Sequence, residues 1–196
     1  MTLASETRRA LVTPRELSVP DEFLRDVLTP YKPRCRYLQR ARVVVGSNVP
    51  QIPTSRECAL NAHGEFQIPE SCYIADTGHF NAVEYNICYN QLAYTLLAAC
   101  IEHQLLGALC SWSMEQYRQR QLPDFLIVDF TSEFRAPMQS ARFEGFVGIS
   151  KATTRRGTVF MKTISQFRDY QGGFSRGHAL IAVLDRGARG AEQVAQ

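Results

Sequence analysis

The feature that most constrains the fold is a long apolar stretch that follows a polar loop. Between Asn81 and Gly107 the chain contains neither proline nor glycine, which leaves room for about seven helical turns. Asn81 and Glu84 form a capping-box pair, so we predict that a helix begins directly after Asn81. Apolar residues cover both sides of this helix, a pattern typical of helices buried over most of their circumference.

Polar residues interrupt the predicted helix in two places. A narrow stripe carries Glu84, Gln91, Thr95 and Glu102, and an otherwise apolar flank carries Asn86 and Asn90 one turn apart. A buried amide without a hydrogen-bond partner costs on the order of 1–3 kcal/mol. Asn90 is therefore expected either to bind neighbouring backbone or to line a pocket.

Most of the remaining chain carries strand signals. Strands are predicted at 36–45, 58–68, 125–130 with an extension to 137, 142–152, 158–168 and 179–184. A short helix capped by Ser18 precedes them, and a polar helical segment lies at 113–121. Gly157 is expected to supply positive φ in a hairpin turn at 153–157, and 171–173 is a second turn.

The order of these elements excludes a doubly wound parallel sheet, because no helices cross between consecutive strands. We therefore expect an α+β fold in which an antiparallel sheet of five or six strands wraps around one long central helix. At 196 residues the chain has the size of one domain. We assign it to 14–185, with a flexible tail at 1–13, a loop at 46–56 and a disordered tail at 186–196.

Composition limits the partners and the compartment. Hydrophobic residues make up 45% of the chain, yet no apolar run reaches the roughly 18 residues of a membrane span. A net charge of +3 gives no argument for nucleic acid or a membrane surface. The six cysteines form no CxxC pair, so we interpret them as reduced thiols of a cytoplasmic protein without a zinc site. No phosphate-binding or dinucleotide-binding loop is visible, and no cofactor is expected.

His79 is the histidine with the strongest catalytic context, because it lies in a glycine-containing loop at a helix start. The positive end of a helix disfavours a charged imidazole, and a neutral imidazole is what a general base requires. The alternative is a loop histidine bound to backbone. The other three histidines, His63, His103 and His178, are expected to be structural or surface residues. There is no GxSxG motif, although Cys72 leaves a Cys–His pair as an alternative.

Several short sequence motifs resemble the FcoT-like thioesterase family, and the resemblance extends over roughly residues 20 to 185. They are Tyr73-Ile74, the run from Thr77 to Glu84 (TGHFNAVE) and the run from Asn90 to Tyr94, with weaker matches at Pro30-Tyr31 and at Phe134 to Pro137. The resemblance implies the hot-dog fold, homodimers or higher homo-oligomers, and activity on acyl thioesters. Some members hydrolyse the thioester. Others add glycine to the β-carbon of an enoyl thioester in the biosynthesis of β-amino acid and isonitrile natural products.

The resemblance also implies the roles of individual residues. His79 would deprotonate glycine and return a proton to C2, and Glu84 is either a second base or only part of the cap. Polar contacts to glycine and to the acyl carbonyl are expected from Tyr73, Gly78, Asn81 and Asn90, and Tyr31 is expected to close the pocket. The alternatives to substrate binding are that Tyr73 is only an amphipathic loop residue and that Asn81 only caps the helix. Lys32 and Arg135 are the open candidates for the glycine carboxylate.

The acyl carbonyl must be polarised in both reactions. Backbone N–H groups at a helix start do this well, so those of residues 80 to 83 are the expected donors. The preferred function is addition of glycine to a (2E)-enoyl thioester of a carrier protein or coenzyme A, giving an N-(carboxymethyl)-3-aminoacyl product. Hydrolysis, alone or after the addition, is the first alternative, and a non-catalytic acyl-thioester-binding module is the second.

One set of cations offers a surface for the phosphates of coenzyme A or for an acidic carrier. They are Lys151, Arg155, Arg156, Lys162, Arg168 and Arg176. A solvated strand face explains the same residues.

Overall fold

The computed structural model describes residues 14–46, 58–75 and 78–184. The two predicted tails and most of the predicted loop at 46–56 lie outside these residues. Within the described part, no helix is both long and apolar enough to cross a membrane.

Seven strands, three α-helices and two short 3-10 helices make up the described chain. In order they are β1 (Arg15–Ser18), α1 (Asp21–Val27), η1 (Pro33–Cys35), β2 (Leu38–Val45), β3 (Leu60–Phe66), α2 (Ala82–Glu102), η2 (Gly107–Leu109), α3 (Met114–Arg120), β4 (Phe125–Ala136), β5 (Phe143–Arg155), β6 (Thr158–Asp169) and β7 (Phe174–Leu184).

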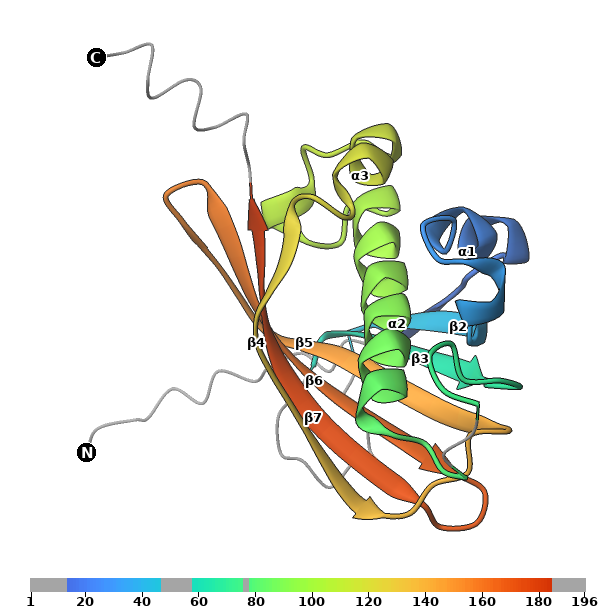
Figure 1. Ribbon diagram of the computed structural model, residues 1–196. Helices are drawn as coiled ribbons and strands as arrows, with labels where there is room; N and C mark the ends of the chain where they lie inside the picture. Colours follow the sequence, from blue (N-terminus) through green and yellow to red (C-terminus); the bar gives the residue numbers. More distant parts are fainter. Residues whose placement is uncertain (1–13, 47–57, 76–77, 185–196) are drawn as a thin grey trace, which may run out of the picture.

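All seven strands form one antiparallel sheet in the order β1-β2-β3-β5-β6-β7-β4. Helix α2 lies along the inner face of this curved sheet, with α1 and α3 beside it (Figure 1). Two tyrosines of α2 reach the sheet, where the hydroxyl of Tyr85 binds Ser165 at 2.9 Å and that of Tyr89 binds Thr163 at 2.7 Å. The expected sheet around one buried helix is confirmed.

The polar stripe on α2 is structural. The Oε1 atom of Gln91 accepts hydrogen bonds from the backbone N–H groups of Tyr37 (3.0 Å) and Leu38 (2.9 Å), and its Nε2 atom donates to the carbonyl of Cys35. The hydroxyl of Thr95 donates to the Gln91 carbonyl at 2.8 Å. Gln91 therefore fastens the start of β2 to the helix and satisfies buried backbone groups that no sheet partner reaches.

The first helix and the strand count differ from the sequence prediction. Residues 15–18 form an edge strand, so Ser18 ends β1, and Pro20 is the N-cap of α1 without a side-chain hydrogen bond. A four-residue strand is too short to show alternation, which is why the sequence did not reveal it. The predicted hairpin is correct but tighter, because β5 continues to Arg155 and the turn consists of Arg156 and Gly157, both with positive φ.

Glycines allow the close approach of α2 to the middle of the sheet. Gly64 and Gly145 are paired neighbours on β3 and β5. A Cβ atom on Gly64 would lie 2.5 Å from the Leu38 side chain and 3.1 Å from Leu92 of α2. The absence of a side chain here lets the helix and the aromatic core pack directly onto the sheet.

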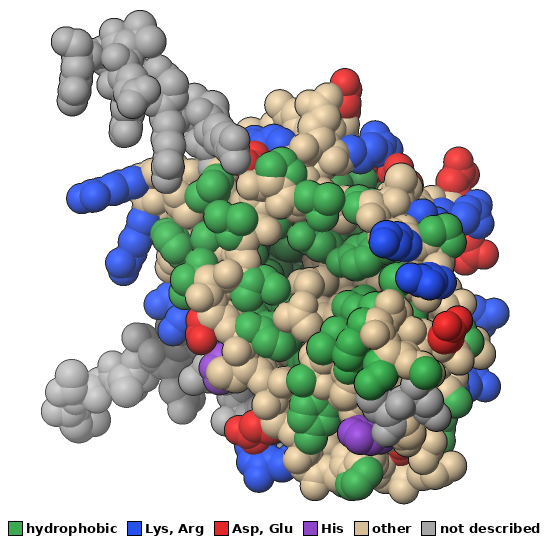
Figure 2. Space-filling model, viewed as in Figure 1, with side chains coloured by type: hydrophobic (Ala, Val, Ile, Leu, Met, Phe, Trp, Pro, Cys, Tyr) green, Lys and Arg blue, Asp and Glu red, His purple; other side chains and the backbone are tan. Residues whose placement is uncertain are grey.

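Large hydrophobic side chains are exposed along one side of the molecule. Figure 2 shows hydrophobic groups spread over α2 and the adjacent strand β4. The β4 members are Leu126, Ile127, Val128 and Phe134, and those near the start of α2 are Tyr73, Ile74 and Val83. A contiguous surface of this kind is typical of an interaction site.

We predict that Gln91→Leu lowers the free energy of unfolding by about 2–4 kcal/mol, because three buried backbone groups lose their partner. Thr95→Ala, one turn away, is the matched control and should cost about 1 kcal/mol, because the Gln91 carbonyl keeps its helical bond. Urea denaturation measures both. Equal effects of the two substitutions would contradict the assigned role of Gln91.

Acid should destabilise the fold through His63. Burial, reinforced by the charge of Arg42, lowers the pKa of His63 from 6.5 to about 4. The unfolded chain therefore binds a proton that the folded chain does not, and the free energy of unfolding should fall as the pH drops from about 6.5 towards 4. The carboxylates of Glu16 and Glu144 oppose the shift. His63→Gln should flatten this part of the stability–pH curve, and an unchanged slope would contradict the assignment.

Candidate active site

A cavity of about 700 Å³ opens between the start of α2 and the end of β4. It is lined by Gly78, His79, Phe80, Asn81, Ala82, Phe134, Arg135, Ala136 and Pro137. The structure thus brings together three of the predicted site residues, Gly78, His79 and Asn81, with the carboxylate-binding candidate Arg135. Gly78 has φ +69, a conformation that glycine adopts without strain, and His79 is exposed to solvent.

Phe80 anchors the loop that carries the histidine. Its ring is 1% exposed and packs 4.7 Å from the ring of Phe143 and 5.5 Å from that of Phe167. Its backbone N–H donates to the carbonyl of Met138 at 2.9 Å. Phe80 is therefore fixed by its ring and by its backbone, and it holds the chain directly after His79, which is exposed and lines the cavity.

The expected set of backbone donors is largely wrong. The N–H of Phe80 binds Met138, that of Asn81 binds the Glu84 carboxylate at 3.4 Å, and that of Val83 binds the Asn81 side chain at 3.0 Å. The N–H of Ala82 is different, since it has no partner among the residues that the structure describes. The capping box satisfies the N–H groups of Asn81 and Val83, as capping side chains at a helix start commonly do, and the loop at Met138 satisfies that of Phe80.

Asn81 and Glu84 form the predicted capping box. The Oδ1 atom of Asn81 accepts hydrogen bonds from the backbone N–H groups of Val83 and Glu84. Glu84 is buried, and its carboxylate accepts from the N–H of Asn81. This geometry supports the capping role of Glu84, and Glu84 does not line the cavity described above.

Tyr31 and Asn90 belong to a second group, farther along α2. Burial raises the pKa of the Tyr31 hydroxyl, and the neighbouring Tyr94 and Cys88 of α2 raise it further. Asn90 is half-buried, and its Nδ2 atom donates to Oδ1 of Asn86 at 2.9 Å. Nine residues separate Asn90 from the N-cap, a rise of roughly 13 Å. Neither Tyr31 nor Asn90 is among the residues that line the cavity at the helix start, so their place in the substrate site stays a prediction.

Tyr73 is 52% exposed and lies on the loop before the histidine. The adjacent Cys72 is held by its backbone N–H, which donates to the hydroxyl of Tyr37 at 3.0 Å. Its thiol is hydrogen bonded to Cys35, and burial together with Cys72 raises the pKa of the Cys35 thiol. These contacts tie Cys72 to β2 and η1 and give no support to a Cys–His pair.

The two candidates for a carboxylate ligand lie in different places. Arg135 lines the cavity with His79 and forms an ion pair with Glu133 at 2.7 Å. Lys32 is exposed at the start of η1 and is not among the residues lining that cavity. Position therefore favours Arg135 of the two.

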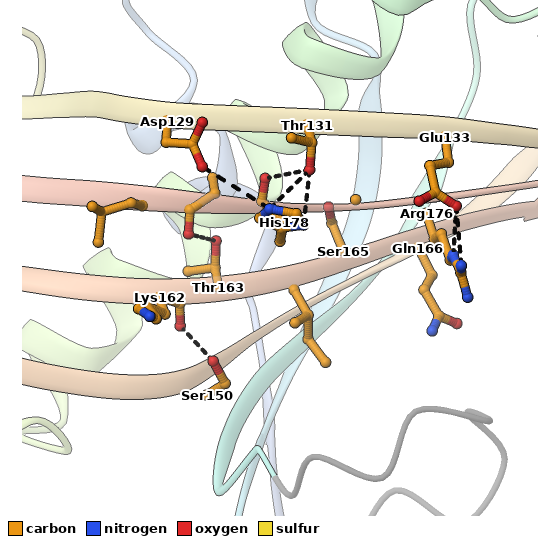
Figure 3. Close-up of a pocket in the computed structure, with 14 residues that line it drawn as sticks. Asp129, Thr131, Glu133, Ser150, Lys162, Thr163, Ser165, Gln166, Arg176 and His178 are labelled. Atoms are coloured by element: carbon orange, nitrogen blue, oxygen red, sulfur yellow. Dashed lines mark hydrogen bonds and ion pairs between the residues drawn. The ribbon is translucent and has the colours of Figure 1, made fainter.

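A second concavity, of about 720 Å³, lies on the outer face of the sheet (Figure 3). Here Thr131 binds the His178 ring at 2.8 Å, and Glu133 pairs with Arg176 at 3.0 Å. Arg176 and then Arg135 hold the pKa of Glu133 below its usual value. Strands β4, β6 and β7 present these side chains to solvent, so the predicted surface role of His178 agrees with its position, as does the solvated-face interpretation of Lys162 and Arg176.

The fold and this cavity define a class of protein. One long helix wrapped by a curved antiparallel sheet, with an open cavity at the helix start, is an α+β hot-dog fold. The chain belongs to the FcoT-like thioesterase family, whose domain model matches residues 26–183. All the sequence motifs on which the resemblance was based, from Pro30-Tyr31 to the run from Phe134 to Pro137, lie within this range.

Relatives cover most of the chain. A (2E)-enoyl-ACP glycyltransferase of Streptomyces coeruleorubidus is 38% identical over 170 residues, which covers 84% of this chain and 97% of that protein. A protein of the same name from Mycobacterium marinum is 32% identical over 187 residues, covering 93% and 96%. A third, from Mycobacterium bovis, is 33% identical over 181 residues, covering 90% and 93%.

Solved structures align more loosely. A thioesterase family protein from Silicibacter pomeroyi is 14% identical, with a TM-score of 0.43, and covers 82% of this chain and 95% of its own. The family assignment rests on the domain model and on the relatives at 32–38% identity.

Proposed function

We propose that the protein adds glycine across the double bond of a (2E)-enoyl thioester. The observation that carries the proposal is that His79 and Arg135 line the same cavity at the start of α2. A base and a cation in one open cavity suit an amino acid that must lose a proton from nitrogen while its carboxylate is held. The names of the relatives, which are enoyl-ACP glycyltransferases, support the same reaction.

The reaction proceeds by conjugate addition. The glycine amine attacks C3 and forms the new C–N bond, while the electrons of the C2=C3 bond move through C1 onto the thioester oxygen. His79 takes the proton that the amine loses and then delivers a proton to C2, which restores the carbonyl. The product is an N-(carboxymethyl)-3-aminoacyl thioester, and no external oxidant or reductant is needed. Natural-product biosynthesis in a cytoplasmic setting fits such a β-amino acyl unit.

An acyl carrier protein is the proposed carrier of the enoyl group, since the relatives' names specify it, with a coenzyme A thioester as the alternative. Hydrolysis of the thioester is the second candidate function, favoured by the description of the family as thioesterase-like. Both reactions need a polarised carbonyl and differ in where the nucleophile lies.

A second copy of the chain is the proposed partner at strand β4. This strand pairs with β7 on one side, and its other edge has no partner strand within the described residues. Exposed apolar residues line it, and an uncovered edge of twelve residues is a template for pairing. Residues 134–137 also line the cavity, so a partner on β4 would cover the cavity mouth.

Mass spectrometry of the product tests the reaction. Incubation with a medium-chain 2-enoyl thioester should give a mass gain of one glycine only when glycine is present, and His79→Ala should lose at least 100-fold of the rate. Formation of free acid that does not depend on glycine would contradict the proposal and indicate a thioesterase. Thioester that stays unchanged with and without glycine would indicate an acyl-binding module without catalytic activity.

Arg135→Met should raise KM for glycine about 10-fold with little change in kcat, because the carboxylate loses a charged partner. Arg176→Met is the matched control, since Arg176 binds the same Glu133 but lies on the outer face of the sheet. Steady-state kinetics with varied glycine distinguishes the two substitutions. An equal KM for both variants would contradict the assignment of Arg135.

The proposed dimer predicts that Val128→Asp converts the protein to monomers, because a charge would be buried at the β4 edge. Leu122→Asp, equally exposed but in the turn before β4, should leave the dimer intact. Light scattering after size-exclusion chromatography gives the mass of each. A monomeric wild type at micromolar concentration would contradict the proposal.

A further inference from the structure

Two half-buried thiols meet between η1 and the loop that leads to His79. Cys35 ends η1, Cys72 lies directly before Tyr73, and both are free cysteines of intermediate exposure. Their side chains are hydrogen bonded to one another, although they lie far apart in the sequence. Contact between two cysteines is the arrangement from which a disulfide can form with little movement of the backbone.

Backbone hydrogen bonds hold both cysteines in place. The N–H of Cys72 donates to the Tyr37 hydroxyl at 3.0 Å, and that hydroxyl donates to the carbonyl of Glu70 at 3.5 Å. On the other side, the side-chain amide of Gln91 donates to the carbonyl of Cys35. Because Cys72 is fastened to β2 and Cys35 to α2, the two thiols stay close in the folded protein.

Arg34 favours Cys35 as the reactive thiol of the pair. Burial and the neighbouring Cys72 raise the pKa of the Cys35 thiol, and the guanidinium of Arg34, which is hydrogen bonded to this thiol, opposes the shift. The thiolate is the form that attacks an oxidant, so the adjacent cation promotes the reaction at Cys35. Cys88 of α2 lies near Cys72 but is fully buried, which shields it from a dissolved oxidant.

A bond between the two cysteines would join two segments that carry predicted substrate contacts. Tyr31, which is expected to close the pocket, is fastened to the η1 segment because Nε of Arg36 donates to its carbonyl at 3.0 Å. Tyr73 follows Cys72 directly. A disulfide holds its sulfur atoms at about 2 Å, closer than any hydrogen bond, so its formation draws the two segments together.

We propose that Cys35 and Cys72 form a reversible intramolecular disulfide, and that this bond lowers the activity of the protein by drawing the segments of Tyr31 and Tyr73 together. The oxidant is a hydroperoxide. The loss of activity rests on the proposed function for its substrate, whereas formation of the disulfide does not depend on it.

The chemistry of the pair is a two-electron oxidation. The Cys35 thiolate attacks one oxygen of hydrogen peroxide, the O–O bond breaks, and Cys35 becomes a sulfenic acid while hydroxide takes up a proton. The sulfur of Cys72 then attacks the Cys35 sulfur, the S–O bond breaks, and the departing hydroxide takes the thiol proton of Cys72. Two thiols and one peroxide thus give one disulfide and two waters, and a dithiol reverses the oxidation.

Mass spectrometry tests the bond. Treatment with hydrogen peroxide should lower the intact mass by two hydrogens and remove two thiols from alkylation of the denatured protein, and peptide mapping should join residues 35 and 72. Cys72→Ser and Cys35→Ser should each abolish the bond. Cys110→Ser is the matched control and should keep it, because the exposed Cys110 thiol donates to the backbone carbonyls of Gln104 and Leu106. A disulfide to Cys110 or Cys88, or oxidation to sulfinic acid alone, would overturn the assignment.

The rate of glycine addition tests the effect of the bond. Oxidation should lower kcat of the wild type at least about 10-fold, since a displacement on the order of 1 Å at a positioning group can cost about 100-fold, and dithiothreitol should restore it. After the same treatment, Cys72→Ser should keep its rate and Cys110→Ser should lose it. An unchanged rate in the presence of the disulfide, or a loss that persists in Cys72→Ser, would overturn the proposed switch. If the wild type hydrolyses thioesters without adding glycine, the proposed function fails, and the same comparison made on hydrolysis still decides the switch.

Discussion

The structure depends on the burial of one helix inside a curved sheet. Most side chains of α2 are buried, 14 of its 21 residues, so the polar groups among them must find partners within the protein. Tyr85 and Tyr89 bind hydroxyls of β6, Gln91 binds the backbone before β2, and Asn81 and Glu84 satisfy the helix start. The half-buried Asn86 and Asn90 follow the same rule, because Nδ2 of Asn90 donates to Oδ1 of Asn86. Burial of the helix thus gives most of its polar side chains structural roles.

The helix start combines rigidity with access. Phe80 is locked by its ring and by its N–H, and the capping box fixes the first turn. His79, directly before Phe80, is exposed and lines the cavity together with Arg135 from the end of β4. A base next to a fixed residue can be held near a reacting amine without being buried, which suits a group that must exchange protons.

Much of this arrangement was predictable from the sequence, for identifiable reasons. The helix from Ala82, its capping box and the hairpin at Gly157 follow from local signals that nothing in the fold opposes. Strand β1 was missed because four residues carry no periodicity. The backbone donors were wrong because the sequence identifies a capping pair but does not reveal that Phe80 binds Met138, which lies far along the chain. Arg135 was recognised only as one of two cations, since its place beside His79 depends on the pairing of β4 with β7.

The most direct test of the central claim is the reaction carried out in deuterium oxide. If His79 delivers the proton to C2 within the cavity, the product should carry one deuterium at C2, in a single configuration relative to the new C3–N bond. Proton NMR of the isolated product measures both the content and the configuration. A mixture of configurations at C2 would show that bulk water protonates the enolate, and it would contradict an account in which His79, held beside the start of α2, is the base.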